Sequence, residues 1–492
     1  MLQTLVLLYP FWATAKALTW SRGHYSVHSL LWLTSGALVF FVLALASGHK
    51  NGWIGGLTDG AKSRANTGGV FFWKRFPSLS RFAQPLSDSA WGALLAALTS
   101  WQSYRMLRHP YILYAEPTSR ALHAINWTLW VVTIASAAAA VRFILHMRRG
   151  IQPAATKSTD LTQTFAVSAV GLLLFARILT PFASPHPGID VFTIDVSAIE
   201  NLLRGINPYT LTYADIYGGF YKYPPKLSYP PGFLYLIAPW TALFHEPRWA
   251  SVLAELASAW GIAVLARSRG FHRSIANWFA AVWLAFPVGL FLVEHAWVDV
   301  LLVPFFIWGA VALQRKRWAA AGILLGYSVM VKQYAAAALF FATVAVFRQV
   351  GFQAAFRLVR AALLTCLVVA LPWLFWNAQA LFDSNIQLFL SMPPREDALS
   401  WVAHSLHEKG VVLSATWTTG AFVAAFLGAL ALVLRRAGNV AANSTAATAF
   451  FLWLGFLFAK QAFCNYYYLT AALVWTWLVV TEASDVAVSS SA

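Results

Sequence analysis

Residues 162–181, TQTFAVSAVGLLLFARILTP, form an apolar run that is interrupted by a single charge, Arg177. An apolar helix of about 18 residues or more can cross the roughly 30 Å hydrocarbon core of a bilayer, so this run predicts a membrane span. A long polar segment follows at residues 185–232, PHPGIDVFTIDVSAIENLLRGINPYTLTYADIYGGFYKYPPKLSYPPG. The alternation of apolar runs with polar loops recurs along the chain and decides the fold class.

Composition supports the same class. Of the 492 residues, 59% are hydrophobic and 11% are charged, whereas a soluble domain averages roughly 45–50% apolar and 25% charged residues. We predict an all-α polytopic membrane protein of about 11–13 transmembrane helices, with a large extracytoplasmic loop that carries the active site. The predicted spans are Leu30–Ser47, Leu122–Leu145, Thr162–Pro181, Trp249–Ala266, Ile275–Val293, Val300–Leu313, Ala319–Met330, Ala335–Phe347, Ala361–Trp376, Val411–Leu434, Thr448–Phe458 and Tyr467–Val480.

The basic residues indicate topology. The formal charge of +17 could suggest nucleic-acid binding, but the bases lie in short loops between apolar runs. Short loops rich in Lys and Arg are typical of the cytoplasmic side of membrane proteins, so we predict no nucleic-acid partner. The loops concerned are His146–Arg149, Arg267–Arg273, Arg315–Arg317, Arg348–Arg360 and Arg435–Arg436.

Alternation of the spans then gives each loop a side. With His146–Arg149 in the cytoplasm, the span at residues 162–181 runs outward and places the Asp190 loop on the extracytoplasmic face. Arg267–Arg273 is also cytoplasmic, so the chain crosses the membrane an odd number of times between Asp190 and Arg267. Trp249–Ala266 supplies one crossing, and the apolar segment Phe233–Phe244 is therefore expected to be re-entrant or interfacial. The other loops expected on the outer face are Glu294–Asp299, Lys332–Tyr334, residues 376–410 and Lys460–Tyr466.

We divide the chain near residue 160. Residues 161–492 form the main transmembrane module, and residues 1–160 form an N-terminal membrane extension with a basic loop. In that extension, apolar residues from Trp91 to Met106 recur at helical spacing and predict an amphipathic helix at a membrane interface, with a weak span as the alternative. Cys366 and Cys464 are expected to be inert core thiols. No Cys/His spacing typical of a metal site occurs, and we expect no metal and no cofactor.

The polar loop at residues 185–232 is the candidate active site. A chain with few acids places Asp190, Asp195, Glu200 and Asp215 in this one segment. Carboxylates near lipid headgroups are electrostatically costly, so such a concentration indicates function. The loop is also rich in proline, which forbids continuous helix and favours a structured cavity wall.

Other polar residues collect at the predicted outer ends of the spans. A carboxylate there could accept a proton from a hydroxyl, while cations could neutralise a phosphate leaving group. These residues are Arg177, Asp190, Asp195, Glu294, His295, Asp299, Lys332, Gln333, Arg395, Glu396, Asp397, His404, Lys460, Gln461 and Asn465.

Structural roles are the alternative for each of them. Asp190 could be a helix N-cap or the ion-pair partner of an arginine, and Asp195 and Asp215 could be caps or turn residues. Lys332 and Lys460 could extend to headgroups without a specific ligand. The outer tyrosines and tryptophans could form an interfacial belt instead of binding substrate.

Several short motifs follow one another in a recognisable order. They are Asp190-Val191-Phe192, LLRGINPY at residues 202–209, Tyr223-Pro224-Pro225, KQY at residues 332–334, and KQAF at residues 460–463 followed by Asn465-Tyr466-Tyr467. Over residues 162–480, this order resembles the GT-C superfamily of integral membrane glycosyltransferases. The resemblance is to the bacterial branch that uses polyprenyl-phosphate mannose. The preceding extension of about 160 residues departs from that pattern and leaves the acceptor open.

The resemblance implies a GT-C-like fold and an inverting transfer of a sugar, mannose in this branch, from a polyprenyl-phosphate carrier to an extracytoplasmic lipid or glycan acceptor. It implies a bacterial inner membrane, with membrane lipids as neighbours. The loop acid would be the general base, and Asp190 fits this role better than Asp195. The residues expected to bind substrate are Arg177, Asn207, Tyr209, Tyr223, Glu294, His295, Asp299, Lys332, Gln333, Arg395, His404, Lys460, Gln461, Asn465 and Tyr466.

Two other classes of function compete with this one. A lipid flippase or solute transporter would also use intramembrane charges and broken helices. Against it, the two halves of the sequence show no repeat, and the charges gather at one predicted face. A structural subunit of an envelope assembly is the third reading, although it would not require the acid-rich loop.

Overall fold

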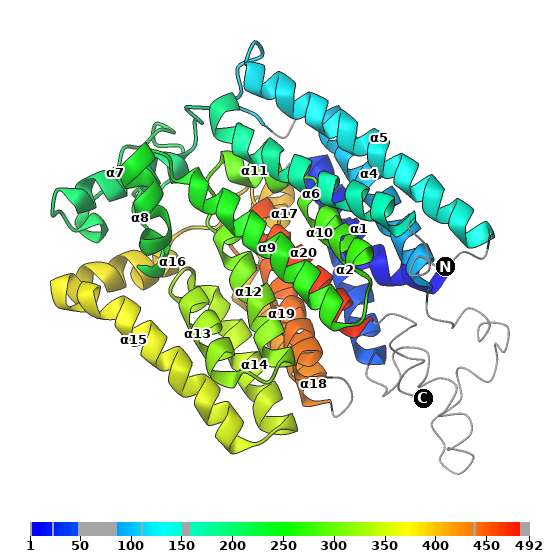
Figure 1. Cartoon of the computed structure of the whole chain (residues 1–492). Helices are drawn as coiled ribbons and strands as arrows, with labels where there is room; N and C mark the ends of the chain where they lie inside the picture. The colour runs from blue at the N-terminus through cyan, green and yellow to red at the C-terminus, as the bar shows by residue number, and fades with distance from the viewer. Residues whose placement is uncertain are drawn as a thin grey trace.

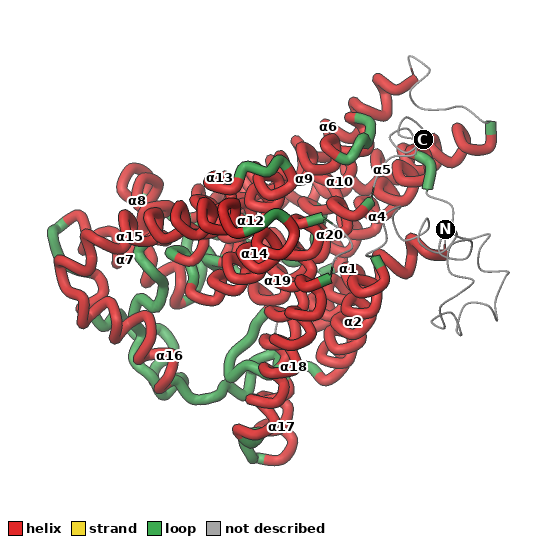
Figure 2. The backbone as a smooth tube through the Cα atoms, turned by 90° about the horizontal axis from the view of Figure 1, so that it is seen from below, coloured by secondary structure: helices red, strands yellow, loops and turns green. Residues whose placement is uncertain are grey.

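The structure is a computed structural model that describes residues 2–21, 24–47, 86–109, 112–149, 158–435 and 439–482. Within these ranges every regular element is a helix (Figures 1 and 2). The all-α prediction is therefore confirmed. The predicted basic loop of the N-terminal extension lies mostly outside the described residues.

Most of the described helices from α8 (Gly232–Phe244) onward follow one another with short connections, whereas a long loop separates α7 (Asp190–Leu203) from α8. The α-helices are α1 Leu2–Ser21, α2 Val27–Ala46, α4 Asp88–Arg108, α5 Arg120–Arg148, α6 Ser158–Ala183, α7 Asp190–Leu203, α8 Gly232–Phe244, α9 Arg248–Ser268, α10 Arg273–Leu284, α11 Gly289–Glu294, α12 Asp299–Gln314, α13 Trp318–Val329, α14 Ala336–Gln349, α15 Phe352–Phe382, α16 Leu388–Ser391, α17 Trp401–Lys409, α18 Ala415–Leu434, α19 Val440–Leu457 and α20 Cys464–Thr481. Short turns of tighter or wider helix lie at Pro208–Thr210, Gln333–Ala335 and Asp383–Gln387.

Seven of the described helices are long and apolar enough to cross a membrane, so the protein is membrane-embedded. They are Val27–Ala46, Arg120–Arg148, Leu161–Ala183, Arg248–Ser268, Phe352–Ser391, Ala415–Leu434 and Val440–Leu457. Three shorter apolar helices are Gly232–Phe244, Asp299–Gln314 and Trp318–Val329. The polytopic architecture is confirmed, and the expected 11–13 crossings stay a prediction.

One predicted span is interrupted. The sequence suggested a continuous helix over Ile275–Val293, but α10 ends at Leu284 and α11 begins only at Gly289. Pro287 lies in the gap, where it lacks an N–H donor and disfavours helical backbone in the preceding residue. The break frees the carbonyl of Leu284, which accepts a 2.5 Å hydrogen bond from Arg177 Nη2.

The loop that carries Asp190 leaves the helical bundle and returns to it at one place. Arg248, the first residue of α9, donates a 2.7 Å hydrogen bond from Nη1 to the carbonyl of Ser184, just beyond α6. Residues 184–248 therefore begin and end side by side, and α7 and α8 pack against each other at one edge of the molecule (Figure 1). The expectation that Phe233–Phe244 is re-entrant or interfacial stays a prediction.

The start of α8 is pressed against the end of α13. A Cβ atom on Gly232 would lie 2.5 Å from the carbonyl oxygen of Met330, so only glycine fits this approach. The Tyr327 hydroxyl donates a 3.0 Å hydrogen bond to the Gly232 carbonyl. These contacts bring the proline-rich loop next to Lys332, which follows α13 in the chain.

The N-terminal extension packs closely on the rest of the chain. Phe11 of α1 lies with its ring centroid 4.6 Å from that of Trp475 in α20. The helix predicted near Trp91 is present as α4 and packs against α5 and α10. Its buried side includes Thr99, Gln102 and Ser103 as well as apolar residues, so the structure does not bear out the predicted amphipathic pattern. Its location at a membrane interface stays a prediction.

Candidate active site

A cavity of about 290 Å³ lies where the proline-rich loop meets the ends of several helices. Its wall combines residues that are far apart in the sequence. They are Asp190, Ile194 and Asp195 from α7; Tyr217, Tyr221, Tyr223 and Tyr229 from the loop; His295, Lys332, Arg395, Gln461, Asn465 and Tyr466 from later segments; and His24, Leu113 and Tyr114 from the extension.

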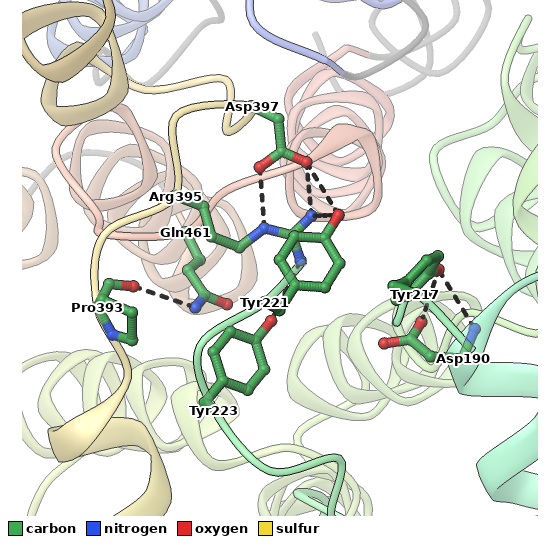
Figure 3. A network of polar contacts seen from close by, with 8 residues as sticks. All are labelled: Asp190, Tyr217, Tyr221, Tyr223, Pro393, Arg395, Asp397 and Gln461. Carbon is green, nitrogen blue, oxygen red and sulfur yellow. Dashed lines mark hydrogen bonds and ion pairs between the residues drawn. The ribbon is translucent and has the colours of Figure 1, made fainter. Parts of the chain in front are cut away.

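Asp190 is the first residue of α7, where the helix dipole favours a negative charge. It is not the N-cap, because Ile189 occupies that position, and it forms no ion pair with another described residue. Its Oδ1 atom accepts a 2.9 Å hydrogen bond from the Val191 amide. The same atom accepts a 3.3 Å hydrogen bond from the Tyr217 hydroxyl (Figure 3).

Burial raises the pKa of Asp190 above its ordinary value. The hydrogen bond from Val191, the cation of Arg395 and the hydrogen bond from Tyr217 act in the opposite direction and only reduce this rise. A carboxyl whose pKa is moved toward neutral pH is better suited to exchange a proton with a hydroxyl group.

Asp195 follows on the same helix and is 1% exposed. Neither of its carboxylate oxygens has a hydrogen-bond partner among the described residues. Burial, with a further contribution from Asp190, raises the pKa of Asp195 well above its ordinary value. It is neither a cap nor a turn residue. Asp215, in contrast, accepts hydrogen bonds from the amides of Tyr217 and Gly219 and is a turn residue.

Arg395 forms another wall of the cavity and is held from several sides (Figure 3). Its Nε and Nη2 atoms pair with Asp397 at 2.9 and 2.6 Å, and Nη2 also donates to the Tyr221 hydroxyl. Nη1 donates a 3.3 Å hydrogen bond to Tyr223. The guanidinium lies 4.4 Å from the centroid of the Phe463 ring. The result is a fixed, partly exposed cation.

In the pair of Arg395 and Asp397, each residue stabilises the charged form of the other. Burial lowers the pKa of Arg395, but Asp397 and the neighbouring tyrosines outweigh it and raise the pKa overall. Burial likewise raises the pKa of Asp397, but Arg395 outweighs it and lowers the pKa below the ordinary value. Both groups are therefore ionised near neutral pH.

Lys332 supplies a second cation. Its Nζ atom lies 2.8 Å from Asp299 Oδ2, beside the rings of Tyr229 and Tyr466. Asp299 also accepts a 2.5 Å hydrogen bond from Asn465 Nδ2. Asp299 thus fixes Lys332 and Asn465, and it is these two that line the cavity.

Chemically, the cavity places a carboxyl group that can accept a proton opposite fixed cations, between aromatic walls. Within the described residues, no three His, Cys, Asp or Glu side chains gather as a metal site would require. No family model, curated protein or solved structure matches this chain. Its function is therefore inferred from the cavity itself.

Several residues predicted to bind substrate lie outside the cavity wall. Arg177 is fully buried and pairs with Glu255 at 2.8 Å. Asn207 caps the turn at Tyr209, whose hydroxyl donates to the Tyr229 carbonyl. The Arg177 guanidinium, the Asn207 side-chain oxygen and the Tyr209 hydroxyl bind other parts of the chain, so these residues have an architectural position. The Asn207 side-chain nitrogen has no hydrogen-bond partner among the described residues.

The remaining residues outside the wall also have protein partners. Gln333 donates to the carbonyls of Ser228 and Asn385. His404 Nδ1 lies 2.7 Å from the Tyr25 hydroxyl. Lys460 donates to the carbonyls of Leu390 and Met392. The predicted residues that do line the cavity are Asp190, Asp195, Tyr223, His295, Lys332, Arg395, Gln461, Asn465 and Tyr466.

Glu294 connects the cavity to the N-terminal extension. Its carboxylate accepts hydrogen bonds of 2.7 and 2.8 Å from the amides of Leu113 and Tyr114, both of which line the cavity. A second connection is the 2.9 Å hydrogen bond from the Tyr25 amide to the Asp397 carbonyl. The extension therefore contributes directly to the site.

Tyr217, Tyr221, His24 and Tyr114 are among the cavity residues that sequence reasoning missed. Tyr217 and Tyr221 lie in the run YGGFYKY at residues 217–223, whose density of aromatic residues could have marked them. His24 and Tyr114 belong to the extension, and nothing in the local sequence connects them with Asp190. Only the tertiary packing brings them to the cavity.

Proposed function

We propose that the protein is a membrane glycosyltransferase that moves a sugar from a polyprenyl-phosphate carrier to a lipid or glycan acceptor. The observation that carries this proposal is the shared cavity of Asp190 and Arg395, a carboxyl of raised pKa beside a fixed cation. The resemblance of the motifs to the polyprenyl-phosphate-mannose branch of the GT-C superfamily makes mannose the sugar to test first.

In the proposed reaction, Asp190 removes the proton from an acceptor hydroxyl. The hydroxyl oxygen forms a bond to the anomeric carbon of the donor sugar, on the face opposite the phosphate. The bond from that carbon to the phosphate oxygen breaks, and the phosphate leaves with the electron pair. Arg395 and Lys332 stabilise the charge that develops on the phosphate, which is the role that fixed cations perform best in a partly buried site.

The surroundings of the cavity suit a lipid-linked donor. It lies at the ends of apolar helices, so a polyprenyl chain can remain in the bilayer while its phosphate reaches Lys332 and Arg395. The distribution of basic loops supports an extracytoplasmic site, and the resemblance supports a bacterial inner membrane. Four tyrosines, Tyr217, Tyr221, Tyr223 and Tyr229, line the cavity, and an aromatic wall of this kind suits a sugar ring.

The test is a transfer assay with purified protein in detergent, radiolabelled polyprenyl-phosphate mannose and an extract of membrane acceptors. We expect Asp190→Asn to reduce transfer by about 10²- to 10⁴-fold, the usual contribution of a general base. Glu200→Gln is the matched control, because Glu200 lies on the same helix but outside the cavity wall.

Full transfer by Asp190→Asn would remove Asp190 from the chemistry. Absence of transfer by the wild-type protein with several lipid-linked sugars would argue against the enzyme. A transporter would then have to be tested in sealed vesicles, because detergent removes the two compartments that transport requires.

A further inference from the structure

The proposed reaction gives Asp190 the role of general base and assigns no role to its neighbour Asp195. Asp195 lines the same cavity, is 1% exposed, and offers two carboxylate oxygens that no described residue contacts through a hydrogen bond. Its neighbours on α7 include the buried residues Ile194, Ala198 and Ile199. An apolar residue would fit such surroundings without any unpaired polar atom.

A buried polar group without a partner destabilises a fold, and native proteins rarely retain one without a reason. The titratable groups that face Asp195 are Asp190, Tyr213 and Tyr229. Tyr213 and Tyr229 provide no compensating charge: the Tyr213 hydroxyl donates its hydrogen bond to the Pro208 carbonyl. Because Asp195 lines the cavity, a group that enters the cavity could supply the missing partner.

We propose that Asp195 binds a hydroxyl group of a neutral sugar ring in the cavity and thereby selects the sugar. This inference rests on the proposed function, in that it takes the cavity to be a sugar site. It divides the cavity into two parts. The α7 wall with Asp195 holds the sugar, while Arg395 and Lys332 on the other walls hold the phosphate.

The chemistry of Asp195 favours a hydroxyl group over an anion. Burial and the nearby Asp190 raise the pKa of Asp195 well above its ordinary value, which favours the neutral form of the carboxyl group. A neutral carboxyl donates one hydrogen bond and accepts another, which is the pattern that a hydroxyl group satisfies. A site built around such a pair discriminates strongly against an analogue that lacks the hydroxyl, because the buried carboxyl is then left unpaired.

The experiment measures the affinity of purified protein in detergent for methyl glycosides of mannose, glucose, galactose and arabinose by calorimetry. Wild-type protein should bind at least one of them. Asp195→Asn should retain affinity within about threefold, since an amide also donates and accepts, and Asp195→Leu should weaken binding about tenfold or more. The thermal midpoint of Asp195→Leu should equal or exceed that of wild type, because a buried unpaired carboxyl has been removed.

A second measurement identifies the hydroxyl group and does not depend on the leucine variant. Monodeoxy analogues of the sugar that binds are compared on wild type and on Asp195→Ala. One deoxy analogue should lose about tenfold in affinity for wild type and little for Asp195→Ala. Glu200→Ala serves as the control, with the affinity pattern of wild type.

The outcomes separate this inference from the proposed transfer. Sugar binding that depends on Asp195, without transfer from any lipid-linked donor, would keep the inference and overturn the transferase. Transfer by wild type with unchanged sugar affinity in Asp195→Leu would overturn the inference and keep the transferase. Failure of the wild-type protein to bind any neutral sugar would also overturn the inference.

Discussion

Two arginine–carboxylate pairs of similar geometry occupy very different positions in this protein. Arg177 pairs with Glu255 at 2.8 Å, and both side chains are fully buried. Arg395 pairs with Asp397 at 2.6 Å, but the two side chains are 16% and 29% exposed and Arg395 lines the cavity. Both arginines were predicted from sequence to hold the same phosphate.

The buried pair joins four helices. Arg177 of α6 donates to the carbonyls of Leu173 and Leu284, so it reaches α10, while Glu255 of α9 accepts a hydrogen bond from Tyr468 of α20. The donors of Arg177 are thus used within the protein. Arg395 is fixed by its partners as well, but one side of it faces a space that a ligand can enter. The comparison teaches that a place in the cavity wall, and not the residue type, separates a binding cation from an architectural one.

The largest expected effect comes from breaking the buried pair. Arg177→Met should destabilise the protein by about 3–5 kcal/mol, because Glu255 remains as an uncompensated buried charge. Arg395→Gln should cost less, about 1–3 kcal/mol, since its pair is only partly buried and Asp397 loses a charged hydrogen-bond partner. Unfolding by graded denaturing detergent, followed by tryptophan fluorescence, measures both.

The double variant Arg177→Met/Glu255→Leu tests whether the uncompensated charge of Glu255 causes this loss of stability. Replacement of a buried ion pair by apolar residues of similar volume is often neutral, so the double variant should recover most of the lost stability. A double variant as unstable as the single one would show that packing around Arg177, and not its charge, holds the four helices.

An effect of intermediate size is expected on transfer. Arg395→Gln should lower the rate by about 10²-fold, equivalent to the loss of one oriented donor to a developing negative charge. Lys460→Gln is the matched control, because Lys460 is exposed, donates to the carbonyls of Leu390 and Met392, and does not line the cavity. A large loss with Lys460→Gln and none with Arg395→Gln would reverse the assignment of the phosphate-binding wall.

The sequence predicts the membrane architecture well because hydropathy is a local property. Four of the predicted apolar runs each form one helix close to the expected residues, namely α2, α5, α6 and α9. The exception at Ile275–Val293 also has a local cause, Pro287, whose effect hydropathy alone does not register. Most helix positions can therefore be read from the chain itself.

The cavity is predicted only in part, because a polar residue at the end of a helix can face either the protein or the open space. Asp190, Lys332 and Arg395 face the cavity, whereas Arg177 and His404 are bound to partners from distant segments. His404, for example, contacts Tyr25 from the extension, some 379 positions away. Such pairings depend on tertiary packing, and a single sequence contains no signal for them.

The smallest expected effect is on the pH dependence of transfer. Burial raises the pKa of Asp190, so the rate should fall as the pH is lowered through a pKa above the ordinary aspartate value, where the base becomes protonated. The cation of Arg395 opposes this rise, so the acid limb of the profile measured on the residual activity of Arg395→Gln should move to higher pH. Glu255 and its partner Arg177 lie away from the cavity wall, so the double variant Arg177→Met/Glu255→Leu should keep the wild-type profile. An acid limb that moves in this double variant and stays in place in Arg395→Gln would mean that the buried pair, and not the cavity pair, sets the charge that Asp190 experiences.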